Sequence, residues 1–104
     1  MSEFTNVSVA KQANIYFDGQ VISRTVIFTD GTKKTLGVML PGNYEFATEA
    51  QELMEISSGA MEVMLPNASD WISVTSGMSF EVEANAKFSV RVHEVTNYCC
   101  SYFS

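Results

Sequence analysis

Turn signals divide this chain into segments too short for long helices. Glycine follows a residue that favours turns at several places, among them Asp30-Gly31, Pro41-Gly42, Ser58-Gly59 and Ser76-Gly77. Short apolar-rich runs separate these turns, and such runs at close spacing are typical of a β-sandwich or β-barrel. Thr48 to Met54 has the most helical character, and it is too short to be stable as an isolated helix. We therefore expect an all-β fold.

The first hairpin is predicted by its turn. Val21 to Phe28 is rich in β-branched residues, and Lys33 to Leu40 returns as its partner strand. The intervening Asp30-Gly31 is a strong hairpin signal, because both central positions of a type I′ turn need positive φ. By the same logic we expect Glu52 to Ser57 and Ala60 to Leu65 to pair as a second hairpin.

The C-terminal third alternates with a period of two residues. Phe88 to Val95 alternates apolar and polar residues, and Asn97 to Phe103 places Tyr98, Cys100 and Tyr102 on one face. We expect the two tyrosines to contact the core or a second copy of the chain.

The two cysteines, the single tryptophan and the single histidine are expected to have structural or surface positions and no role in a site. Cys99 and Cys100 are adjacent, and a bond between them would strain the peptide, so we expect one reduced thiol in the core and one outside it. Trp71 is expected to anchor the core or an interface, and the single histidine, His93, is expected to be exposed.

The charge balance excludes several classes of partner. The 104 residues include six Lys and Arg against twelve Asp and Glu, a formal charge of −6. Wrapping nucleic acid or binding an anionic membrane surface needs clustered positive charge, so we expect neither partner. No apolar run has the length of a membrane span, and residues 1–17 lack the basic start and apolar core of a secretory signal. We expect one domain over residues 1–104 and a cytoplasmic location.

Several fragments, taken in order, resemble one small bacterial family of cupin type, the pyrimidine/purine nucleoside phosphorylases. The fragments are Tyr16–Gly19 (YFDG), Ser23–Val26 (SRTV), Thr35–Gly42 (TLGVMLPG), Tyr44–Phe46 (YEF), Glu52–Gly59 (ELMEISSG), Asp70-Trp71 and Tyr98-x-Cys100-x-Tyr102. Their order and spacing together are specific, and the similarity spans roughly Asn14 to Tyr102.

The resemblance implies a small cupin-like antiparallel β-barrel or jelly roll whose activity is phosphorolysis. In that reaction inorganic phosphate displaces the base from a nucleoside, which gives the free base and a pentose 1-phosphate. Members of the family accept both purine and pyrimidine nucleosides. The resemblance thus implies a nucleoside-salvage enzyme that needs no cofactor and takes phosphate as a co-substrate.

The cupin resemblance also bears on metal binding. Glu52 occupies the position of the glutamate that binds the metal in most cupins, whereas Tyr44 and Phe46 stand where their histidines lie. We therefore expect a pocket without a metal ion, and metal-dependent oxygenase or isomerase chemistry is disfavoured.

Two residues are candidates for catalysis. Arg24 alternates with the apolar Ile22 and Val26, and its guanidinium group would bind phosphate through two parallel hydrogen bonds. An exposed arginine that aids solubility is an equally good interpretation. Glu52, which the resemblance aims into the barrel, would accept hydrogen bonds from the ribose hydroxyls and stabilise the positive charge that develops on the sugar. The alternative is a solvent-facing glutamate.

Four further residues are candidates for binding substrate. Tyr44 and Phe46 would stack either type of base, although core packing explains them equally well. Lys33 follows the hairpin turn, from which it could reach the mouth of a pocket, and Asn85 could bind a base edge or phosphate. A solvated lysine and an ordinary turn asparagine are the plainer interpretations of these two.

A second function class stays open, namely a module that binds a small sugar, base or nucleotide without turning it over. The sequence contains no Ser-His-Asp set and no Gly-rich phosphate loop. A barrel this short has a limited core, so we expect a homodimer, with residues 1–13 loosely ordered or exchanged between the copies.

Overall fold

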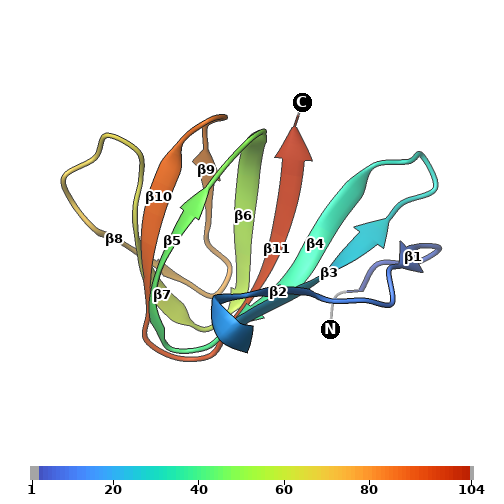
Figure 1. The fold of residues 1–104 in the computed structure, drawn as a ribbon, viewed down its shortest axis with the longest axis horizontal. Coiled ribbons are helices and arrows are strands. Elements are labelled where there is room, and N and C mark those ends of the chain that lie inside the picture. Colours follow the sequence, from blue (N-terminus) through green and yellow to red (C-terminus); the bar gives the residue numbers. More distant parts are fainter. Residues whose placement is uncertain (1–2, 104) are drawn as a thin grey trace.

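The computed structural model describes residues 3–103, and β-strands dominate that range (Figure 1). The element η1 (Phe17–Gly19) is a short turn whose three residues all have positive φ. Within the described residues, no helix has the length and apolar character needed to cross a membrane. The prediction of an all-β fold is confirmed.

The strands form two antiparallel sheets. The larger sheet has the order β1-β3-β4-β11-β6-β9, and β2 also pairs with β3. Its strands are β1 (Ser8–Val9), β2 (Asn14–Tyr16), β3 (Val21–Ile27), β4 (Lys33–Met39), β6 (Gln51–Ser58), β9 (Ser79–Val82) and β11 (Thr96–Phe103). The smaller sheet has the order β5-β10-β7-β8. Its strands are β5 (Gly42–Ala47), β7 (Ala60–Met64), β8 (Ile72–Thr75) and β10 (Lys87–Val92).

The smaller sheet covers only part of the larger one. In Figure 1 it stands opposite β11, β6 and β9, whereas β4, β3 and β1 project beyond it as a separate end. The core lies between the sheets, and the period-two alternation of the strands fills it. On β10, for example, Phe88, Val90 and Val92 are buried and Arg91 is exposed, as the sequence predicts. The cluster of buried apolar residues is Val21, Met39, Tyr44, Met54, Ile56, Met61, Val63, Val74, Val82, Phe88, Val90, Val92, Tyr98 and Cys100.

The first hairpin forms as predicted, but with a different turn. β3 and β4 pair along their whole length. The Gly31 amide donates to the Phe28 carbonyl at 2.9 Å, and the Phe28 amide donates to the Thr32 carbonyl at 2.9 Å. Gly31 has a φ of 88°, whereas Asp30 is not among the residues with positive φ. The connection is therefore a three-residue loop with glycine in the left-handed position, not a type I′ turn.

The prediction of a second hairpin is wrong. β6 pairs with β11 and β9 in the larger sheet, while β7 pairs with β10 and β8 in the smaller one. The chain crosses between the sheets at Gly59, which has a φ of 112°. A Cβ at this position would lie 2.6 Å from the Cα of Thr96. The glycine therefore marks a tight corner between two sheets and not a reversal within one.

The described part of the N-terminal segment lies along the edge of β3. β1 pairs with Val26 and Ile27, and β2 pairs with the stretch from Val21 to Ser23. The two short strands thus cover much of this edge from within the same chain. Exchange of residues 1–13 between two copies stays a prediction, and residues 1 and 2 lie outside the described range.

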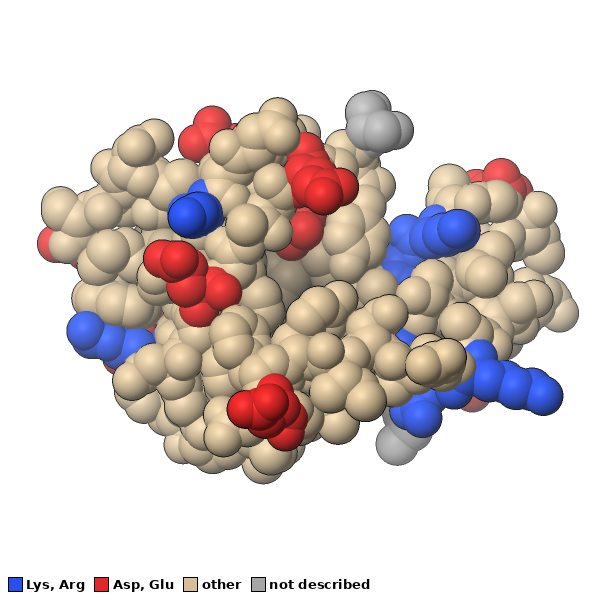
Figure 2. Space-filling view, in the orientation of Figure 1, with Lys and Arg blue, Asp and Glu red and all other residues tan. Residues whose placement is uncertain are grey.

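Positive charge is concentrated at the projecting end of the larger sheet. Four of the six cationic residues belong to it or to its connections, namely Lys11, Arg24, Lys33 and Lys34. Figure 2 shows several of the blue side chains gathered at this end, with red acidic side chains over the sandwich. The acidic chain therefore presents one locally basic region.

Candidate functional site

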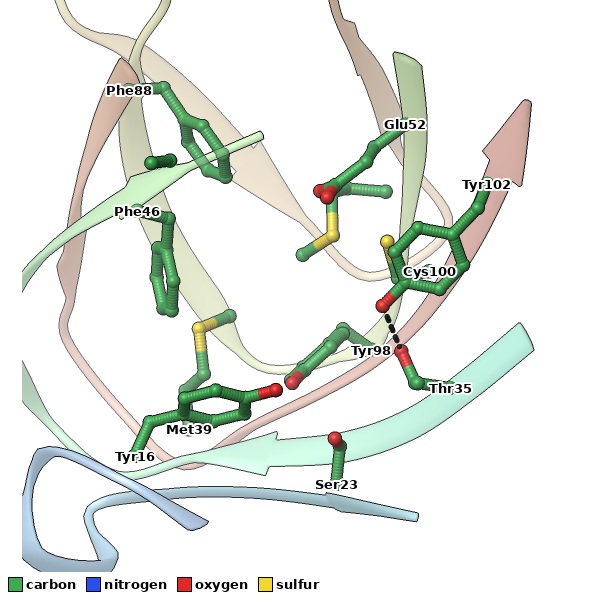
Figure 3. Close-up of a pocket in the computed structure, with 12 residues that line it drawn as sticks. Tyr16, Ser23, Thr35, Met39, Phe46, Glu52, Phe88, Tyr98, Cys100 and Tyr102 are labelled. Atoms are coloured by element: carbon green, nitrogen blue, oxygen red, sulfur yellow. Dashed lines mark hydrogen bonds between the residues drawn. The ribbon is translucent and has the colours of Figure 1, made fainter. Parts of the chain in front are cut away.

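A cavity of about 130 Å³ lies between the two sheets, where the projecting end leaves the sandwich. The elements β2, β3, β4, β5, β6, β10 and β11 all contribute to its lining (Figure 3). The lining residues are Tyr16, Ser23, Thr35, Met39, Phe46, Ala47, Glu52, Met54, Phe88, Tyr98, Cys100 and Tyr102. The two walls of the cavity differ sharply in chemistry.

The wall from the smaller sheet is aromatic. Phe46 and Phe88 are directly paired on β5 and β10, and their rings stack with centroids 5.5 Å apart and an interplanar angle of 27°. Phe17 meets the ring of Phe46 edge-on at 5.4 Å. An aromatic wall of this kind offers a flat apolar face to a planar ligand.

The wall from the larger sheet is rich in hydroxyl groups. Ser23, Thr35, Tyr98 and Tyr102 come from adjacent strands, and Tyr16 faces them from β2. The Thr35 and Tyr102 hydroxyls are 2.9 Å apart, as the dashed line in Figure 3 marks. These groups can both donate and accept hydrogen bonds, so this wall suits a ligand with several hydroxyl or oxo groups.

Glu52 adds a carboxyl group to the hydroxyl-rich wall. It lies directly opposite Tyr102 in the pairing of β6 with β11, and Figure 3 shows its carboxyl group aimed into the cavity. Its partial burial raises its pKa, and a hydrogen bond with Cys100 opposes that effect. Burial, together with the charge of Glu52, raises the pKa of the Cys100 thiol to about 12. Glu52 is therefore placed to contact a ligand, while the thiol stays protonated at neutral pH.

Phe46 lies in the cavity, as expected of a residue that stacks a base, but Tyr44 does not. The Tyr44 side chain is buried, and its hydroxyl donates to the Leu40 carbonyl at 2.6 Å. Its ring packs against Phe17 with centroids 4.9 Å apart. Tyr44 therefore supports the aromatic wall from behind and fixes the turn that leads into β5.

Arg24, the candidate for binding phosphate, does not line the cavity that contains Glu52 in the single chain. Ser23 points into the cavity, so the next residue on the strand points to the opposite face. Arg24 is exposed there and lines an outer groove with Ile22 and Leu36. The sequence pattern correctly shows the alternation, but it does not say which face is inside.

Lys33 and Asn85 do not line the cavity either. Lys33 is exposed, although it stands two residues before Thr35 on β4 and so belongs to the same face of the sheet as the cavity. Asn85 is exposed with a φ of 55°, and it occupies the turn before β10. The plainer interpretation of Asn85 as a turn residue therefore matches its position.

The sequence interpretation missed most of the hydroxyl groups. Tyr98 belongs to the core, as expected, but it also lines the cavity together with Tyr102, Ser23, Thr35 and Tyr16, none of which the sequence marks as a site residue. One available signal was the alternation along β11, because it places Tyr98 and Tyr102 on the same face as Cys100. The other was the register with β6, which brings this face beside Glu52, and the sequence does not specify it.

The remaining special residues lie away from the cavity. His93 is exposed as predicted, and its Nε2 is 2.8 Å from a carboxylate oxygen of Glu62. The guanidinium group of Arg91 stacks on Trp71 at 3.8 Å from the ring centroid, on the outer face of the smaller sheet. Both cysteines are free, with Cys100 buried and Cys99 partly buried.

The cavity residues do not suit the metal site of other cupins. In the described part of the chain, no three His, Cys, Asp or Glu residues come together as a metal-binding group. Around Glu52 the lining offers hydroxyl groups, one protonated thiol, thioethers and aromatic rings, and imidazole ligands are missing from it. The chemistry that the site offers is therefore that of these side chains.

Comparison of the sequence with known families supports the resemblance found along the chain. Residues 11–102 match the family model described as pyrimidine/purine nucleoside phosphorylase. A protein of that name from Syntrophotalea carbinolica is 61% identical over 102 residues, which cover 98% of both chains. Another from Geobacter sulfurreducens is 56% identical over 102 residues, again covering 98% of both chains.

Solved structures share the fold. A protein of unknown function from an Acinetobacter species superposes with a TM-score of 0.95 at 42% identity, covering 97% of this chain and 98% of that one. An RmlC-like cupin from Shewanella frigidimarina superposes with a TM-score of 0.71 at 14% identity, covering 98% and 93%. The second likeness concerns the fold alone, and it confirms the prediction of a cupin-like architecture.

Proposed function

Because this chain belongs to the pyrimidine/purine nucleoside phosphorylase family, we propose that it cleaves purine and pyrimidine nucleosides with inorganic phosphate. The products are the free base and a pentose 1-phosphate. The observation that carries this proposal is the cavity, because it combines an aromatic wall, a hydroxyl-rich wall and a half-buried carboxyl group.

The reaction needs the groups of each wall at a different part of the substrate. An oxygen of hydrogen phosphate forms a bond to the anomeric carbon, the bond from that carbon to the base nitrogen breaks, and the base leaves with the electron pair and takes up the proton that the phosphate gives up. Positive charge develops on the sugar, and Glu52 stabilises it while accepting hydrogen bonds from the sugar hydroxyls. Phe46 and Phe88 provide the face on which the base stacks.

The size of the cavity fits broad acceptance of bases. Its volume of about 130 Å³ is below the ~300 Å³ at which sites for small molecules usually begin. It therefore encloses the sugar end of a nucleoside and leaves much of the base at the open mouth. A base held by stacking at the mouth is not selected by its hydrogen-bonding edge, which accounts for the use of both purines and pyrimidines.

Phosphate needs a cation near the cavity, and Lys33 is the candidate on the same face of the sheet. Its ammonium group lies at the projecting end, where much of the positive charge of the chain gathers. We assign it the attraction of phosphate to the cavity mouth, and we assign no metal or cofactor to the reaction. The activity serves nucleoside salvage in the cytoplasm.

We further propose that the chain works as a homodimer. The outer face of the projecting end exposes Val9, Ile22 and Leu36 around the groove that contains Arg24. A second copy that covers this face would remove apolar side chains from water and bring Arg24 into an interface.

Product chromatography tests the proposed function. Purified protein is incubated with adenosine or uridine, with and without phosphate, and with EDTA present throughout. We expect free base and pentose 1-phosphate to appear only with phosphate, in equal amounts. Absence of product from a panel of nucleosides, combined with thermal stabilisation by a sugar, base or nucleotide, would instead identify a non-catalytic binding module.

A further inference from the structure

Three residues form a straight row across the hydroxyl-rich wall. Ser23 on β3 is paired with Gly37 on β4, and Gly37 is paired with Tyr98 on β11. A shift in the register between β6 and β11 falls immediately before Tyr98. Such irregularities re-aim the side chain beside them. The row and the shift together direct Tyr98 along the wall of the cavity.

Position 37 requires glycine because there is no room for a side chain, and not because of its backbone conformation. A Cβ at this position would lie 2.5 Å from both the Cζ and the hydroxyl oxygen of Tyr98. The Tyr98 ring therefore lies flat across the backbone of β4. Gly77 is the opposite case, because it has a φ of 87° and open space around its Cα. A glycine inside a strand with another group pressed against it marks a close approach that any side chain would prevent.

Ser23, at the far end of the row, lines the same cavity as Tyr98. The Asn14 amide donates to the Ser23 hydroxyl oxygen at 3.2 Å, so one lone pair of that oxygen is occupied from the edge of the sheet. A hydrogen bond from Ser23 opposes the rise that burial causes in the pKa of Tyr98, which reaches about 12. In Figure 3 the Tyr98 and Tyr16 hydroxyls point toward one another inside the cavity.

We propose that Tyr98 binds the sugar end of the substrate through its hydroxyl group, and that Gly37 is the positioning residue that lets its ring lie flat against the sheet. This inference rests on the proposed function. The Tyr98 hydroxyl group lines the cavity and can both donate and accept hydrogen bonds, so it is placed to contact an oxygen of the substrate.

The same row sets the volume of the cavity. A methyl group at position 37 must displace the Tyr98 ring, because the opposing backbone of β4 belongs to a central strand and cannot retreat. The ring can move only toward the cavity, into the space that the sugar occupies. Gly37 therefore acts on substrate binding through Tyr98, without touching the substrate.

A double-substitution cycle tests this coupling. Gly37→Ala, Tyr98→Leu and the double variant are compared with the wild type in phosphorolysis of uridine. We expect Gly37→Ala to lower kcat/KM on the order of 10²-fold, chiefly through KM, and to have little further effect in the Tyr98→Leu background. An equal loss in both backgrounds would overturn the positioning role of Gly37.

Substitutions of the hydroxyl groups keep the inference testable if Gly37→Ala fails to fold. Tyr98→Phe retains the ring, and we expect it to lower kcat/KM on the order of tenfold. Ser23→Ala, which removes another hydroxyl group of the same wall, should give a smaller loss. Kinetics of Tyr98→Phe equal to those of the wild type would overturn the binding role of Tyr98. Gly77→Ala is the matched control, since it strains a turn far from the cavity and should lower the melting temperature without changing KM.

A measurement independent of turnover separates this inference from the proposed function. In the wild type, nuclear Overhauser contacts between the Tyr98 ring and the Gly37 Hα protons are expected. Their absence would overturn the pose itself. If they are present and the protein turns over no nucleoside, the proposed function and the substrate role of Tyr98 both fail, whereas the support of Tyr98 by Gly37 stands.

Discussion

At the scale of single residues, the negative charge of Glu52 lowers the stability of the folded chain but serves the proposed activity. Burial raises its pKa above the usual value of 4.5. The native state therefore holds this proton more tightly than the unfolded chain does. The stability that the protonated carboxyl group confers is fully present below the unfolded pKa and is lost as the pH rises through the folded pKa.

We predict that Glu52→Gln is more stable than the wild type at neutral pH and less active. The neutral amide avoids the cost of a half-buried charge, so its advantage in melting temperature should grow as the pH rises from the usual pKa of 4.5 through the raised pKa of the folded state. The loss of the charge that stabilises the sugar should lower kcat on the order of 10²-fold. Thermal melts across this range and initial rates provide the test. A stability difference that does not change with pH, or full activity in the variant, would show that Glu52 is not a buried charge facing the substrate.

Single residues also show the limit of sequence reasoning. The placement of Glu52 in the cavity agrees with the position that the family resemblance indicated. The placement of Arg24 was not predictable in the same way, because alternation on β3 separates two faces without identifying the inner one. Ser23 and Arg24 differ in burial because the Ser23 face of β3 lines the cavity, whose other walls come from residues far away in the chain.

At the scale of elements, the corner at Gly59 decides how the chain passes from one sheet to the other. Its φ of 112° is unfavourable for other residues, and a Cβ would overlap both the Thr96 backbone and the Val95 carbonyl oxygen. The overlap involves backbone atoms that cannot rotate away. The corner therefore tolerates no side chain.

We predict that Gly59→Ala lowers the free energy of unfolding by about 2–4 kcal/mol, from backbone strain and overpacking together. Gly31→Ala is the matched control, because Gly31 has a similarly unfavourable φ of 88° but open space around it. It should lose only the cost of the conformation, about 1 kcal/mol. Urea denaturation of both variants measures the difference. Equal losses in the two variants would mean that the contact with Thr96 relaxes freely.

The same corner explains which part of the topology could be predicted. Strand positions follow from composition and alternation, and most of them agree with the structure to within about two residues. Pairing partners are less local: Ser58-Gly59 looks like a hairpin turn, yet β6 pairs with β11, about forty residues further along the chain. Turn residues indicate that the chain changes direction at that point. Which strand pairs with which is decided by the burial of the apolar faces of the two sheets.

At the scale of the whole molecule, the cavity depends on strands that are distant in sequence. Its hydroxyl-rich wall combines β2, β3 and β4 with β11, and its aromatic wall combines β5 with β10. A cavity of this kind exists only after both sheets have formed and packed. This is why the sequence identified Phe46 and Glu52, which lie in one stretch of the chain, and missed the tyrosines opposite them.

The uncovered end of the larger sheet makes a prediction about assembly. On its outer face Leu36 is 43% exposed, and it lies in the groove with Arg24. We predict that the wild type is a dimer through this face and that Leu36→Asp is monomeric, because a second copy would have to bury the new carboxylate. Light scattering after size-exclusion chromatography measures the mass directly. Ile72→Asp is the control, since Ile72 is similarly exposed at 47% but lies on β8 of the smaller sheet, and this variant should stay dimeric. A monomeric wild type at tens of micromolar, or a dimeric Leu36→Asp variant, would reject this face as the interface.

If the dimer is confirmed, Arg24→Ala should lower kcat/KM for phosphate in the dimer and have no effect in the Leu36→Asp monomer, because Arg24 can approach a substrate only across the interface.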